Sequence, residues 1–116
     1  MKIYLFDVDE TLEISGGPVT FQSIIDLKAQ GNIVGLCGNW GLITRNTRGW
    51  ENLFSLINVA ADKVAFMQSI LRYVPADDYI MVGNRKGGVS PDDEELTRLA
   101  GGWRFIAEKD FAAGSR

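Results

Sequence analysis

Short apolar runs recur along the chain, separated by segments in which apolar residues return every three or four positions. The runs have the length of strands that are buried on both faces. Three of them predict strands: Ile3–Phe6, Ile33–Leu36 and Tyr79–Val82. A final strand is predicted over Trp103–Ile106, which includes Arg104. The intervening periodicity predicts helices over residues 21–28, 62–74 and 90–100. This alternation predicts a three-layer α/β sandwich with a mostly parallel, Rossmann-like sheet.

The same spacing predicts which side of each helix is buried and where each helix begins. Thr20 is expected to cap the first helix, and Ser90 the third, with Pro91 at its first helical position. The expected buried residues are Phe21, Ile24, Ile25 and the Lys28 stem in the first helix, Val64, Met67, Ile70, Leu71 and Val74 in the second, and Leu96, Leu99 and Ala100 in the third. Residues 40–58 carry a weaker hydrophobic pattern, and a short helix is expected around Glu51–Leu56. The residues after Ile106 are expected to form a short polar tail.

Composition narrows the class of protein. The 116 residues suit a single domain spanning 1–116. The net charge of -3 provides no general attraction for nucleic acid or membranes, and neither a membrane span nor a signal peptide is expected. The single cysteine, Cys37, fits a reducing cytoplasm. Because the chain has no histidine, Ser-His-Asp and Cys-His nucleophile systems and histidine-ligated zinc are excluded.

Acidic residues follow the first predicted strand at once. Side chains alternate along an extended chain, so Asp7, Asp9 and Thr11 are expected to point the same way. Two adjacent carboxylates repel each other unless a cation lies between them or they share a proton. The arrangement therefore predicts a divalent metal site or an acid/base pair where this strand ends.

Polar residues also follow two other predicted strands. Cys37, Gly38 and Asn39 end the second, and Gly83 and Asn84 end the third. In parallel α/β sheets, ligands bind beyond the carboxyl ends of the strands. These three strand ends together predict a phosphate and metal site.

The segment from Phe6 to Leu12, with the pattern Asp-x-Asp-x-Thr, resembles the signature of the haloacid dehalogenase superfamily, most of whose members are phosphatases that form an aspartyl-phosphate. The resemblance implies that Asp7 is the nucleophile and Asp9 the general acid/base. It also places Thr11 in the phosphate-binding site, and it implies Mg²⁺ as cofactor.

Two further motif positions follow from the same resemblance. Cys37 stands where the family has a phosphate-binding Ser or Thr, and Gly38 and Asn39 would add backbone N–H groups. The alternative for Cys37 is a small buried apolar residue. Lys63 stands where the family has a lysine that neutralises the nucleophile and phosphate, the alternative being an ordinary surface lysine.

The metal-binding positions depart from the family pattern. By the resemblance, Asp7, the Asp9 carbonyl and the residue at position 84 would hold Mg²⁺, yet the usual aspartate is here Asn84. Asparagine offers an oxygen ligand without charge. Asp92 or Asp93 would restore the charge if the preceding loop folds back. The alternative is that Ser90 and Asp93 only form a helix capping box.

The predicted function is hydrolysis of phosphomonoesters by a Mg²⁺-dependent enzyme without a cap domain, because the gaps 12–20 and 40–62 are too short for one. Its site would be open, or closed by a partner subunit in a homo-oligomer. The phosphorylated substrate would be either a small molecule or a macromolecule. Arg45, Arg48, Arg85 and Lys86 would border the site, unless they are ordinary surface charges. The alternative function is a non-catalytic binding or regulatory module with a degraded metal site. A receiver-type phosphoacceptor is a third.

Overall fold

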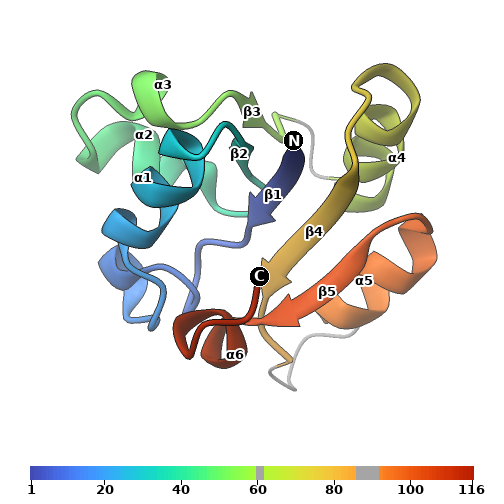
Figure 1. The fold of residues 1–116 in the computed structure, drawn as a ribbon. Coiled ribbons are helices and arrows are strands. Elements are labelled where there is room, and N and C mark those ends of the chain that lie inside the picture. The colour runs from blue at the N-terminus through green and yellow to red at the C-terminus, as the bar shows by residue number, and fades with distance from the viewer. Residues whose placement is uncertain (60–61, 86–91) are drawn as a thin grey trace.

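The computed structural model describes residues 1–59, 62–85 and 92–116, and its centre is a five-stranded, entirely parallel sheet (Figure 1). The strands are β1 (Lys2–Phe6), β2 (Ile33–Leu36), β3 (Leu56–Ile57), β4 (Asp78–Gly83) and β5 (Arg104–Ala107). Their order is β3-β2-β1-β4-β5. At the end of the central strand, Phe6 lies opposite Leu36 of β2 and Val82 of β4. The predicted parallel α/β sheet is confirmed.

Helices cover both faces of this sheet. They are α1 (Phe21–Ala29), α2 (Trp40–Asn46), α3 (Trp50–Leu53), α4 (Lys63–Tyr73), α5 (Asp93–Ala100) and α6 (Glu108–Ala112), with a 3-10 turn η1 at Glu13–Ser15. Figure 1 shows α4 and α5 on one side of the sheet and α1 on the other. None of the helices in the described residues combines the length and apolar character that crossing a membrane requires.

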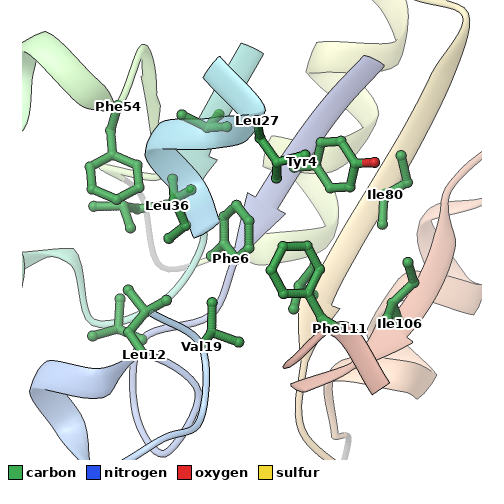
Figure 2. Packing of buried hydrophobic residues seen from close by; sticks show 14 of the residues in the cluster. Tyr4, Phe6, Leu12, Val19, Leu27, Leu36, Phe54, Ile80, Ile106 and Phe111 are labelled. Carbon is green, nitrogen blue, oxygen red and sulfur yellow. The ribbon is translucent and has the colours of Figure 1, made fainter. Parts of the chain in front are cut away.

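Two buried clusters hold the layers together. On the α1 and α6 face, the Phe6 and Phe111 rings meet edge to face with centroids 5.3 Å apart (Figure 2). On the α4 and α5 face, the Trp103 indole N–H donates to the Met67 carbonyl over 3.0 Å. This bond satisfies the polar atom of a large buried side chain, which packing alone would leave without a partner.

Three short elements differ from the expectation. The helix expected around Glu51–Leu56 ends at Leu53, and Leu56–Ile57 instead form the edge strand β3. Residues 40–46 form α2, for which no helix was predicted. The expected polar tail contains α6, whose Phe111 is fully buried against β1. Elements of two to seven residues span too few turns or pleats for hydrophobic periodicity to reveal them.

The buried sides of two helices are rotated from those predicted. In α1 the buried residues are Ile24 and Leu27, and Ile25 is 46% exposed. In α5 the predicted core residue Leu99 is 59% exposed. There the buried positions are Asp93, Thr97 and Ala100, because the helix turns two polar side chains toward the sheet. That orientation turns Asp93 toward the ends of the strands.

Candidate functional site

A buried cluster of charges occupies the carboxyl ends of the central strands. Lys63 Nζ lies 3.5 Å from Asp7 Oδ1 and 3.1 Å from Asp93 Oδ1. Asp7, which directly follows β1, is 8% exposed, and Asp93 is 5% exposed. Lys63 is the first residue of α4, a helix capped by the Asp62 side chain, and Asp93 is the first residue of α5. The end of the central strand and the first residues of two crossover helices therefore bring together side chains that are distant in the sequence.

Two carboxyl groups in this cluster share one ammonium group. The pKa of Asp7 is raised to about 8, because burial has the largest effect and the hydrogen bond to Asp93 and the charge of Asp93 act in the same direction. The charge of Lys63 and the hydrogen bond from the Val8 N–H act in the opposite direction. Burial works to lower the pKa of Lys63, but the charges of Asp7 and Asp93 outweigh it and raise that pKa. Below about pH 8 the cluster thus balances its charge by keeping a proton on Asp7, and a bound cation would favour release of that proton.

The raised pKa of Asp7 gives a testable pH dependence. Between about pH 4 and pH 8 the unfolded chain releases the Asp7 proton while the folded chain keeps it, so stability falls as pH rises through this window. Asp7→Asn removes the titrating group. We expect this variant to be more stable than the unsubstituted protein by on the order of 3 kcal/mol at pH 8, and by little at pH 4. Urea unfolding in EDTA across this range measures the difference, and parallel pH curves for both proteins would contradict it.

Two glycines allow the acidic side chains to lie against the backbone. A Cβ at Gly38, where φ is +153°, would stand 2.2 Å from Asp7 Oδ1. A Cβ at Gly83 would stand 2.4 Å from Asp93 Oδ2. Because real Cβ atoms do not approach so closely, both positions require glycine as long as the carboxylates keep their places. Gly38 was predicted as a site residue, and its lack of a side chain is part of how it shapes the site.

The Gly38 N–H has a partner that sequence reasoning missed. It donates to Asn58 Oδ1 over 2.8 Å, and Asn58, which follows β3, is 4% exposed. The expected phosphate contact from this N–H would therefore compete with Asn58. The signal in the sequence is a polar residue directly after a short apolar pair, but it can be recognised only once Leu56–Ile57 is known to be a strand.

Removal of the Asn58 amide should leave the partly buried Gly38 N–H without its partner. We expect Asn58→Ala to lower the free energy of unfolding by about 1–3 kcal/mol, because the change removes a buried side chain and leaves a partly desolvated donor unsatisfied. Asn46→Ala is the matched control: this exposed amide donates to the Leu42 carbonyl, and its loss should change stability by about 0.5 kcal/mol or less. Equal effects in urea unfolding would contradict the role of Asn58.

A second set of hydrogen bonds fixes the loop after β1. Asn39 Nδ2 donates to Asp9 Oδ1 over 3.1 Å, and Asn84 Nδ2 donates to the Asp9 main-chain carbonyl over 3.0 Å. Asn84 Nδ2 also lies 3.4 Å from Thr11 Oγ1. Asp9 is exposed, whereas Thr11 is fully buried. The structure thus joins Asn39 and Asn84 to Asp9 through their amide groups, and it places Thr11 beneath the loop.

Cys37 lies behind Asp7 in the core. It is 0% exposed within the cluster on the α4 and α5 face. Burial raises the pKa of its thiol to about 12. A buried neutral thiol is the behaviour of a small apolar residue. This placement agrees with the alternative reading of Cys37.

The two candidate acids at the start of α5 have separate places. Asp92 is the N-cap, and its Oδ1 accepts a hydrogen bond from Glu95 N over 2.9 Å. Asp93 Oδ2 accepts from Asn84 N over 3.1 Å, in addition to its contact with Lys63. The expected cap Ser90 and the following Pro91 lie outside the described residues. Of the two acids, Asp93 is the one that joins Asp7.

The predicted bordering cations are dispersed. Arg85 pairs with Glu94 over 2.9 Å, and its guanidinium lies 5.3 Å from the centroid of the Phe105 ring. Arg45 Nε donates to the Gly41 carbonyl of its own helix. Lys86 lies outside the described residues. Arg85 is therefore committed to contacts with β5 and α5.

The donor set suits Mg²⁺ in chemistry and charge. Hard oxygen ligands are available from the Asp7 and Asp93 carboxylates, the Asp9 carbonyl and the Asn84 amide, if that amide turns its oxygen toward the site. A cation bound there would take the place of the proton that Asp7 otherwise keeps below about pH 8. Within residues 1–59, 62–85 and 92–116, no group of three or more histidine, cysteine, aspartate or glutamate side chains is placed to hold a metal ion. Main-chain or amide oxygens would therefore complete any such site.

Comparisons of this chain with family models, curated proteins and solved structures find no match. They leave the resemblance to the haloacid dehalogenase superfamily as a prediction from the motif residues in the sequence.

Proposed function

We propose that the protein is a Mg²⁺-dependent phosphomonoester hydrolase of haloacid dehalogenase type, without a cap domain, in which Asp7 forms an aspartyl-phosphate. The supporting observation is the buried Asp7 carboxyl group at the end of the central strand, 3.5 Å from Lys63. A nucleophilic carboxylate needs a neighbouring cation when an anionic substrate approaches. Lys63 meets that need, and Asp93 holds its ammonium group in place.

In this mechanism an Asp7 oxygen attacks phosphorus, and the bond from phosphorus to the leaving oxygen breaks. Asp9, in its protonated form, gives the leaving alkoxide its proton. Asp9 then takes a proton from water, which attacks phosphorus and releases Asp7 and inorganic phosphate. Asn39 orients the Asp9 carboxylate by its hydrogen bond to Oδ1. Lys63 neutralises charge that accumulates on the phosphoryl oxygens.

Asp7, Asp93, the Asp9 carbonyl and Asn84 would hold the metal. Bound there, Mg²⁺ would supply charge neutralisation and polarise the phosphoryl group. The residues themselves orient the nucleophile: the Val8 N–H donates to Asp7 Oδ1 over 2.8 Å, so one carboxylate oxygen is fixed.

A non-catalytic binding or regulatory module is the second candidate. It is favoured by the Asn58 and Asn84 amides, which engage the Gly38 N–H and the Asp9 carbonyl, two groups that catalysis would require. In that function the charge cluster would serve to bind a phosphorylated ligand or to organise the fold.

The formation of an aspartyl-phosphate separates the two candidates. The protein is incubated with p-nitrophenyl phosphate and Mg²⁺, release of p-nitrophenol is followed, and a rapid borohydride quench converts any acyl phosphate to homoserine. We expect Mg²⁺-dependent release, with peptide mass spectrometry placing the homoserine at position 7. The absence of release across pH 5–9 with Mg²⁺, Mn²⁺ or Co²⁺ would reject the enzyme and leave the binding module.

A further inference from the structure

A cavity of about 580 Å³ lies between α1 and the segment that runs from the end of α2 through α3. Figure 1 shows these helices grouped on the side of the sheet opposite α4 and α5. The residues that line the cavity are Phe21, Ile25, Lys28, Ala29, Thr47, Arg48, Gly49, Trp50, Asn52 and Leu53. None of them belongs to the carboxylate and lysine cluster, so this cavity is a feature separate from the proposed catalytic site.

The walls of the cavity are largely apolar. Phe21 and Trp50 contribute aromatic surface, and Ile25, which the sequence pattern predicted to be buried, is 46% exposed here. A volume of several hundred Å³ with aromatic walls and few polar groups is typical of small-molecule sites. A ligand with an apolar body would bury the surface that Ile25 and its neighbours now present to water.

The charged residues that line the cavity, Lys28 and Arg48, are both positive. Lys28 Nζ is held by the Asn52 and Leu53 carbonyls, so its charge is committed to the end of α3. Arg48 is exposed, and within residues 1–59, 62–85 and 92–116 its guanidinium makes no hydrogen bond or ion pair. The Arg48 guanidinium is therefore positioned at an apolar cavity and available to an anion, in a protein whose net charge of -3 otherwise repels anions.

We propose that this cavity binds a small amphipathic anion, in which an alkyl or aromatic body carries a carboxylate. The body lies against Phe21, Trp50 and Leu53, and the carboxylate pairs with Arg48. The apolar body supplies most of the affinity, and the exposed ion pair selects the anion over a neutral molecule of the same shape.

The experiment compares decanoate with 1-decanol, two ligands that share an alkyl chain and differ in charge. Each is titrated against the complete chain by displacement of the fluorescent probe 8-anilinonaphthalene-1-sulfonate. We expect both to displace the probe, with decanoate binding more tightly at low salt. Arg48→Gln should weaken decanoate about threefold and leave decanol unchanged. Arg45→Gln, a nearby exposed arginine outside the lining, should change neither.

A cavity-filling variant tests the location independently of charge. Ala29 is exposed on α1 and lines the cavity, so Ala29→Phe should abolish binding of both ligands while urea unfolding stays cooperative. Binding that persists in Ala29→Phe, or equal effects of Arg48→Gln and Arg45→Gln, would overturn the proposal. So would a dimer of the unsubstituted protein that Ala29→Phe dissociates, because a second copy would then be the occupant.

Discussion

Asp7→Asn should lower p-nitrophenyl phosphate turnover by about 10⁴-fold or more, since the amide cannot attack phosphorus and no second carboxylate can replace it. Asp93 is unsuited to substitute for Asp7, because its two oxygens are engaged by Lys63 and the Asn84 N–H. Steady-state kinetics with saturating Mg²⁺ measures the loss.

The same variant provides its own folding control. Asp7→Asn is expected to be at least as stable as the unsubstituted protein above pH 4, so loss of activity cannot be assigned to unfolding. Turnover that survives the substitution, in protein purified free of other phosphatases, would exclude Asp7 as the nucleophile.

Asp9→Asn is expected to lower turnover by about 10²–10⁴-fold, the usual contribution of a positioned acid/base. The carboxylate is exposed and contacts Asn39 through Oδ1. An asparagine at this position keeps an oxygen for that hydrogen bond, so the loop should be preserved. Because proton donation matters most when the leaving group is a poor one, the loss should be larger for an alkyl phosphate than for p-nitrophenyl phosphate.

The neighbouring carboxylate supplies the control for this substitution. Glu10 is exposed on the same loop and adopts a left-handed backbone conformation with φ of 58°. Glu10→Gln changes the local charge by the same amount and should alter turnover by no more than about twofold. If Asp9→Asn retains full activity, or if both variants lose activity equally, Asp9 is not the acid/base.

Most of the sheet could be predicted because β1, β2 and β4 each contain a run of largely apolar residues without a charge. β1, β2 and β4 lie at the centre of the sheet, where neighbouring strands and the helices on both faces cover them. Side chains such as Leu5 and Val82 are therefore fully buried. β3 could not be found, because the two apolar residues Leu56 and Ile57 are common in any segment. α6 escaped for a related reason: its one fully buried side chain, Phe111, makes no periodic pattern within five residues.

The candidate site was predictable only in part. Asp7 and Lys63 were identified by resemblance, and the structure places them 3.5 Å apart. The choice between Asp92 and Asp93 could not be made, because the start of α5 decides which acid caps the helix and which turns inward. Asn58 was missed since its role depends on a hydrogen bond across 20 residues of sequence.

The charge cluster draws Asp7, Lys63 and Asp93 from three separate segments of the chain, and Lys63 and Asp93 alone are 30 residues apart. No fragment of the chain therefore contains the complete arrangement, and it forms only with the tertiary structure. A ligand that requires all of it will bind the native state and ignore unfolded chains, so that each such ligand raises the melting temperature by mass action. Thermal shift in the presence of candidate phosphorylated compounds consequently offers a screen for substrates that does not depend on turnover.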